Sequence, residues 1–349
     1  MRSAYHAGMR TFHRPLILAL GLLGLGGCGP EPGEALFDRY LQTLSQAVQG
    51  APAEPDSNPA PLPPRYPRAR QRIAAVPEVR GGILELFSLS RCDVTQFIAQ
   101  RNSILGRHAD SASHVALGAA ILHRLQQCRA ALAAEDELQT RLATLIAEKR
   151  PALQALGWNA SFGSSAFAQW WSLAAHPVTP DAPAPALAAP VDQLLQAFAA
   201  SRNGEVEAAQ SAFSSAYQVF EQSRAGGAWL LATQRAVSAL ERAQALLRGA
   251  AASHRCAGGR AEHLAQAAQL YQAHVAPHLQ ALERAMDGAA PALERLWAAQ
   301  SPAPSPAAAA VTDFRHAVWQ GSDSLAERLS TLRHRHDELW RAQRLDCAG

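Results

Sequence analysis

The chain of 349 residues carries 32 basic and 29 acidic side chains, and 48% of its residues are hydrophobic. The basic excess disappears if residues 1–27 are removed, because that segment contains Arg2, Arg10 and Arg14 but no acid, which leaves 29 charges of each sign. A neutral chain does not provide the basic surface that nucleic-acid binding requires, so we expect no nucleic-acid partner.

Residues 1–27 have the layout of a signal peptide that is removed from the mature protein. The three arginines precede an uncharged apolar run from Leu16 to Gly27. A helix of that length rises only about 18 Å, whereas the hydrocarbon core of a bilayer is about 30 Å thick. We therefore do not expect this run to span a membrane.

The apolar run ends in Leu25-Gly26-Gly27-Cys28, which resembles the lipobox of bacterial lipoproteins. The resemblance implies that Cys28 is acylated and becomes the first residue of the mature chain, which would then bind a membrane through its lipid. Gly29 stands where an aspartate would favour retention in the inner membrane. We therefore expect an outer-membrane lipoprotein of the cell envelope that faces the periplasm.

Residues 28–69 are expected to form the lipid anchor, a short helix and a proline-rich spacer. An amphipathic helix close to the membrane is predicted over Gly33–Gln49 by four apolar residues at four-residue steps, Leu36, Tyr40, Leu44 and Val48. Residues 51–67 contain seven prolines, which favours extended backbone. This spacer is either a free tether or a strap packed over the surface of the domain.

Residues 70–349 are predicted to form one all-α domain, an irregular helical bundle. Alanine is abundant, β-branched residues are scarce and the apolar pattern is helical throughout. Short helices are expected over Gly82–Ser90 and Asp93–Leu105, the second ending at Gly106. The proline-rich stretch 177–190 is interpreted as a surface connection within this domain, with a domain boundary as the alternative.

A long C-terminal helix is predicted by apolar residues that recur every seven positions, Val311, Val318, Leu325, Leu332 and Leu339. Gly321-Ser322 could bend this helix. Ser324 and Glu327 have capping-box spacing and could restart it.

Four cysteines remain after acylation of Cys28, and an even number in an exported protein predicts two disulfides. Three pairings are possible. We favour Cys92–Cys128 and Cys256–Cys347, because each pair then lies within one half of the chain. A four-cysteine zinc site is the weaker alternative, since the chain has no CxxC pair.

Several catalytic signatures are absent: HExxH, GxSxG, the P-loop and SxxK. Their absence excludes the easily recognised hydrolases, so enzymatic activity is not favoured, and no cofactor is expected. Two histidine pairs, His274 with His278 and His334 with His336, lack helically spaced carboxylates or a common face. We interpret them as surface histidines and predict no metal site.

Five aromatic residues are concentrated in fourteen positions, Trp158, Phe162, Phe167, Trp170 and Trp171. Such rings could stack on a sugar, for example in peptidoglycan. The favoured interpretation is that they fill helix interfaces in an alanine-rich core that lacks other bulk.

Three short motifs occur in order: Ser90-Arg91-Cys92, Arg101-Asn102-Ser103 and Leu105-Gly106. They resemble the hallmark segment of an uncharacterised proteobacterial lipoprotein family, domain of unknown function 3080. With the lipobox, the spacer and Cys128, the resemblance covers most of residues 20–135. It implies no particular activity, because the family has none assigned.

Arg91, Arg101 and Asn102 of this segment offer hydrogen-bond donors beside a predicted disulfide, and could bind an anionic or carbonyl-rich partner. Alternatively, the arginines pair with acids such as Asp93 and Asn102 ends a helix. We favour the second interpretation.

These observations favour a non-catalytic envelope protein that binds another envelope protein or peptidoglycan, or has a structural role. A periplasmic enzyme of the cell wall or lipids is the first alternative. The second is a small-ligand carrier whose cavity is lined by the aromatic cluster Trp158–Trp171.

Overall fold

The computed structural model describes residues 32–49, 61–78, 89–133, 136–180, 182–249, 259–300 and 305–348. Within these ranges the chain is helical and contains no strand, as predicted. The predicted signal peptide and Cys28 lie outside the described residues. The first half comprises α1 (Pro32–Gln49), α2 (Ala69–Arg72), a 3₁₀ turn η1 (Leu89–Cys92), α4 (Thr95–Asn102), α5 (Ile104–Arg107), α6 (Ser111–Ala131), α7 (Glu137–Ala160) and α8 (Ser165–Trp170).

The second half comprises α9 (Ala188–Arg202), α10 (Val206–Ser223), α11 (Ala225–Gly249), α13 (Gly259–Leu270), α14 (Ala276–Gln300), α15 (Pro306–Val318) and α16 (Leu325–Ala348). A π-helical turn η2 (Tyr271–Val275) joins α13 to α14 without a break. Pro277 is the second residue of α14 and lies directly after this π-helical turn, so it does not end the preceding helix.

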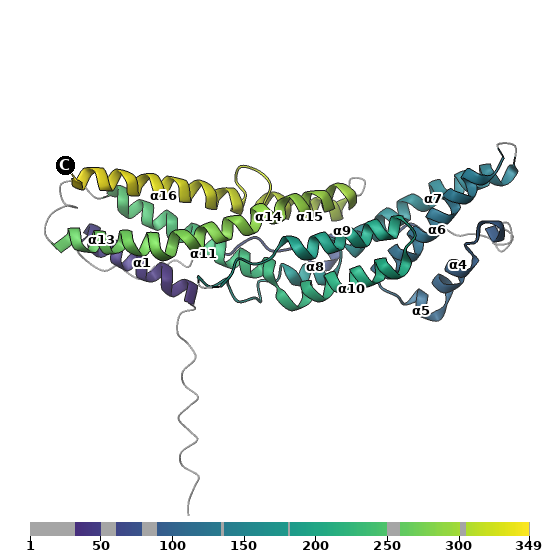
Figure 1. The fold of residues 1–349 in the computed structure, drawn as a ribbon, viewed down its shortest axis with the longest axis horizontal. Helices are drawn as coiled ribbons and strands as arrows, with labels where there is room; N and C mark the ends of the chain where they lie inside the picture. Colours follow the sequence, from purple (N-terminus) through teal and green to yellow (C-terminus); the bar gives the residue numbers. More distant parts are fainter. Residues whose placement is uncertain are drawn as a thin grey trace, which may run out of the picture.

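The helices form an elongated body (Figure 1). Helices α1, α13 and α16 lie at one end, α8 to α10 in the middle, and α4 to α7 at the other end. Helices on both sides of the proline-rich connection contribute to one large apolar cluster, which includes Trp170 before it and Val191 after it. A second, smaller cluster surrounds Cys92 between η1, α6 and α7.

Polar residues define where several helices begin. The Asp110 carboxylate accepts a hydrogen bond from the Ser113 amide at 2.8 Å, and Asp136 accepts one from Leu138 at 2.9 Å. These side chains satisfy amides that have no partner inside the helix, and they place the starts of α6 and α7.

Residues 61–78, which include the described part of the proline-rich stretch 51–67, form a strap packed on the bundle. The Tyr66 hydroxyl donates to the Phe162 carbonyl at 2.7 Å, and the Arg72 carbonyl accepts from the Trp158 indole at 2.7 Å. The Asn159 amide bonds both the N–H and the carbonyl of Ala74, at 2.8 and 2.9 Å. These contacts favour the strap over the free tether for this part of the chain.

The C-terminal apolar repeat is not one continuous helix: α15 ends at Val318 and the long C-terminal helix α16 begins at Leu325, with the break at the predicted bend, Gly321-Ser322. Gly321 adopts φ +110°, a backbone conformation that interrupts an α-helix. The Ser324 hydroxyl then accepts a hydrogen bond from the Glu327 amide at 3.3 Å and restarts the helix as α16. The predicted stop at Gly106 is also displaced, since α4 ends at Asn102 and Gly106 lies inside α5.

Among the described residues one of the two predicted disulfides is present, between Cys92 and Cys128, whose Cα atoms are 5.2 Å apart. The predicted partner pair involves Cys256 and the side chain of Cys347, which lie outside the described part of the chain. The observed bond joins η1 to α6 and thereby attaches the segment before α4 to the bundle.

Helix α1 is part of the main core. Its apolar face, which includes Leu36, Phe37 and Leu44, is buried against α11 and α13. The Tyr40 hydroxyl lies 2.5 Å from Nε2 of His336 in α16, and the Trp340 indole donates to both groups, at 3.0 and 3.1 Å. The sequence interpretation of His336 as a surface residue is wrong, since its side chain is fully buried.

Burial lowers the pKa of His336 to about 4. The indole only donates, so Nε2 accepts, and Nδ1 carries the proton of a neutral ring. Nδ1 has no hydrogen-bond partner within the described structure. Protonation would place a charge in an apolar site and remove the acceptor at Nε2.

This environment predicts a pH-dependent stability. An unfolded histidine titrates near pH 6.5, so between that value and about pH 4 the unfolded chain binds a proton that the folded chain does not. The stabilising contribution is complete above pH 6.5 and is lost as the pH falls toward 4, by roughly 3 kcal/mol in all. Urea denaturation from pH 7 to 4.5 should show a shallower loss of stability in His336→Gln than in wild type. The exposed His334→Gln is the control and should keep the wild-type slope; an unchanged slope in His336→Gln would contradict the assignment.

Candidate functional site

The structure does not bring the three candidate hydrogen-bond donors, Arg91, Arg101 and Asn102, together into one site. Arg91 lies before α4 and Arg101 in its last turn, and the helix rises about 9 Å from its first residue, Thr95, to Arg101. The exposed Arg91 guanidinium pairs with Asp136 at 3.3 Å and not with Asp93. Asn102 is exposed and is the last residue of α4, as the favoured interpretation expected.

The aromatic cluster is assembled, but its rings are buried. Trp158, Phe162, Phe167 and Trp170 are 0% exposed and Trp171 is 1% exposed. The rings pack on one another, with the Trp170 and Trp171 centroids 4.7 Å apart. Because no ring face is accessible, neither sugar stacking nor a carrier cavity at this cluster is supported, and the rings supply the bulk of an alanine-rich core.

A polar cleft that the sequence did not indicate lies between α14 and α16. It has a volume of about 730 Å³ and extends to the break between α15 and α16. Apolar side chains form part of its wall, among them Met286, Leu329 and Trp319. Three carboxylates line it, those of Glu283, Asp287 and Glu327, together with Arg333 and His334.

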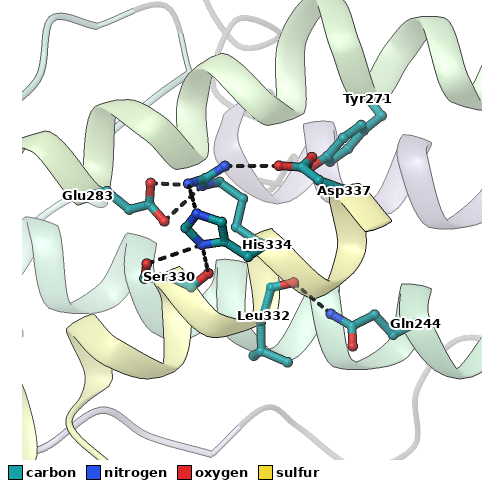
Figure 2. Close-up of polar contacts among 8 residues, drawn as sticks. Gln244, Tyr271, Glu283, Ser330, Leu332, His334 and Asp337 are labelled. Atoms are coloured by element: carbon teal, nitrogen blue, oxygen red, sulfur yellow. Dashed lines mark hydrogen bonds and ion pairs between the residues drawn. The ribbon is translucent and has the colours of Figure 1, made fainter. Parts of the chain in front are cut away.

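Arg333 is the central group of this cleft (Figure 2). Its Nε lies 2.8 Å from both carboxylate oxygens of Glu283, and its Nη1 lies 2.9 Å from Asp337. Asp337 also accepts a hydrogen bond from the Tyr271 hydroxyl at 2.5 Å. Burial alone would lower the pKa of Arg333, but the hydrogen bond and charge of Glu283, with the charge of Asp337, raise it above its usual value.

Trp319 is fixed by a second ion pair at the other side of the cleft. Its indole donates to Glu294 at 2.8 Å, and Glu294 also accepts a hydrogen bond from Nε of Arg315 at 2.8 Å. The Arg315 guanidinium lies 4.7 Å from the centroid of the Trp297 ring, where it forms a cation–π contact. The wall of the cleft is therefore preorganised.

A serine and a histidine adjoin in the cleft, but their geometry does not form a catalytic dyad. Nδ1 of His334 lies 2.8 Å from the Ser330 carbonyl, which can only accept, so Nδ1 carries the proton. Nε2 faces the Arg333 guanidinium at 3.3 Å, which can only donate. A general base needs a free nitrogen lone pair directed at the hydroxyl, and the nitrogen nearest the Ser330 hydroxyl carries hydrogen instead.

Metal binding, membrane spanning and the burial of His278 can also be read from the described residues. In the described ranges no three His, Cys, Asp or Glu side chains are grouped so that they could hold a metal ion. None of the described helices combines the length and apolar character needed to cross a membrane. His278, interpreted from sequence as a surface residue, is instead buried, with its ring 6.0 Å from that of Phe37.

Sequence comparison identifies one family model that matches nearly the whole described chain. Residues 37–348 match the model described as protein of unknown function DUF3080. No curated protein and no solved structure gives a significant match.

The buried ion pair of the cleft should contribute measurably to stability. The side chains of Arg333 and Glu283 are 14% and 13% exposed, so Glu283→Gln leaves a guanidinium with only Asp337 to balance it. We expect a loss of about 3 kcal/mol, at the low end of the cost of breaking a buried pair, measured by urea denaturation at neutral pH. The control is Asp192→Asn, which breaks the exposed pair with Arg295 and should cost less than about 1 kcal/mol. Equal losses of unfolding free energy in the two variants would show that the cleft pair contributes no more to stability than an exposed pair.

Proposed function

The chain belongs to the DUF3080 family, and from that premise we propose that it is a lipid-anchored, non-catalytic binding protein of the bacterial envelope. Cys28 would carry the lipid, and the bundle would lie at the periplasmic face of the outer membrane. The α14–α16 cleft would bind a segment of another envelope protein.

The observation that carries the proposal is that the polar groups in the cleft are already hydrogen-bonded. Arg333, Glu283 and His334 already satisfy one another, so none is a free acid, base or nucleophile. Such a site can recognise a partner through fixed charges without performing chemistry. This favours binding over the periplasmic enzyme that the sequence left as an alternative.

The charges at the rim indicate the kind of partner segment. Glu283 is balanced by Arg333, but the exposed carboxylate of Asp287 has no ion pair within the described structure. Glu327 is also exposed and accepts only a weak contact from Thr331 at 3.4 Å. A segment that carries basic side chains would match these carboxylates, whereas the apolar residues Met286 and Trp319 are only 2% and 9% exposed and offer little surface.

Site-specific photocrosslinking in cells tests this proposal. We expect a photoreactive residue at Asp287 or Ser322 to capture one specific envelope protein. The same residue at the exposed position Glu207 of α10 should not capture it. Asp287→Lys together with Glu327→Lys should reduce capture from Ser322 by about tenfold, because two attractive charges become repulsive.

The anchor is tested in the same cells. A Cys28→Ala form with an ordinary secretory cleavage site should be released from the membrane fraction and lose the crosslink. If capture from the cleft and from Glu207 is the same, or if charge reversal leaves capture unchanged, the cleft is not the binding site. If Cys28→Ala remains in the membrane fraction like wild type, the lipid anchor is wrong.

A further inference from the structure

Residues Leu89–Asp110 form an arm at the end of the molecule opposite to the C-terminus of α16 (Figure 1). The arm comprises η1, α4 and α5. The disulfide between Cys92 and Cys128 attaches it to α6, and the fully buried Val94 packs into the smaller apolar cluster. The arm is thus part of the folded structure at its base.

The far end of the arm exposes two large apolar side chains, Ile104 and Leu105, which we call the apolar tip. They are 72% and 85% exposed, more than any other large hydrophobic residue in the described structure. Their side chains therefore contribute little to the packing of the bundle.

The tip is held in a defined conformation. The Ser103 hydroxyl accepts a hydrogen bond from the Gly106 amide at 3.0 Å and donates to the Gln100 carbonyl at 2.7 Å. A Cβ atom at Gly106 would lie 2.1 Å from that carbonyl oxygen, so the turn requires glycine. The Gly106 carbonyl is bonded in turn by the His114 ring at 2.8 Å, which ties the tip to α6.

The apolar tip is flanked by positive charge. Arg101 and Arg107 lie on either side of it, and residues 95–109 contain no acid. Neither arginine has an ion-pair partner within the described structure. Asp110, the nearest acid after the tip, is engaged as the cap of α6.

We propose that the apolar tip inserts into an anionic phospholipid surface, with Arg101 and Arg107 contacting the lipid phosphates. Apolar side chains gain by entering the boundary between headgroups and acyl chains, and flanking arginines are attracted to a negatively charged leaflet. A specific protein interface typically comprises about 20 to 30 residues on each side. Two apolar side chains are too few to form the core of such an interface. The basic flank and the small apolar area therefore fit a lipid surface better than a protein.

This contact goes beyond the proposed binding function and does not depend on the acyl chain or on the cleft. Alone it would be weak and reversible. Where a lipid anchor already holds the chain at a membrane, a second weak contact gains from the high local concentration and would orient the elongated body.

The test is co-sedimentation of the full mature chain, carrying Cys28→Ala to prevent acylation, with lipid vesicles. We expect binding to vesicles of phosphatidylethanolamine with phosphatidylglycerol, and much weaker binding to phosphatidylcholine alone. Ile104→Ser with Leu105→Ser should lower the partition constant by at least about tenfold. Arg101→Gln with Arg107→Gln should lower it by about fivefold per arginine and remove most of its salt dependence.

Control variants distinguish insertion of the apolar tip from non-specific adsorption to the vesicles. Leu62→Ser removes a residue of the strap that is 70% exposed and should bind like the parent chain. Leu105→Phe should bind more tightly, because it adds apolar area at the tip. Circular dichroism should give the same thermal transition for the apolar variants, since Ile104 and Leu105 at the tip and Leu62 in the strap are largely exposed.

Three results would overturn the proposal. The chain could stay in the supernatant with the anionic vesicles, or the double serine variant could bind as well as the parent. The parent chain could also self-associate in gel filtration without lipid, and the double serine variant could abolish this, which would assign the tip to a second copy of the chain.

Discussion

The docking of α1 on α11 and α13, with the hydrogen bond from Tyr40 to His336 of α16, is the contact on which that end of the bundle depends. Tyr40 and His336 are 296 positions apart in the sequence, and the Trp340 indole donates a hydrogen bond to each of them; all three side chains are buried. Helix α1 also covers apolar residues of α11 and α13, so its removal would uncover the core at that end of the bundle. Helix α1 is therefore a structural element and not a tether.

This docking limits where the bundle can lie. Cys28 precedes Pro32, the first residue of α1, by four positions, and four residues span at most about 14 Å. A lipid on Cys28 would hold the main core close to the membrane. The elongated body has α13 and α16 at the same end as α1, and the arm lies at the opposite end.

Local patterns in the sequence predicted the features that depend on neighbouring residues. The four-residue steps of Leu36, Tyr40 and Leu44 predicted α1, and the proximity of Cys92 and Cys128 in the chain favoured their disulfide. The concentration of tryptophans before the proline-rich connection indicated core packing, which the burial of all three bears out.

Features that depend on distant contacts could not be predicted. His336 resembled a surface residue because its burial comes from α1, which is far away in the sequence. The sequence did not indicate that Arg333 forms an ion pair, because its partner Glu283 lies on another helix, fifty positions earlier. The seven-residue apolar repeat extended across a true break because Val318 and Leu325 are both buried, although Gly321 separates their helices.

Hydrogen–deuterium exchange of the full mature chain tests the central role of α1 most directly. If α1 belongs to the core, peptides from Leu36–Val48 should be protected to the same degree as peptides from Trp229–Leu247 of α11, because both helices would open only when the bundle unfolds. Exchange of Leu36–Val48 within seconds, while α11 stays protected, would show that α1 is a tether and would contradict the account.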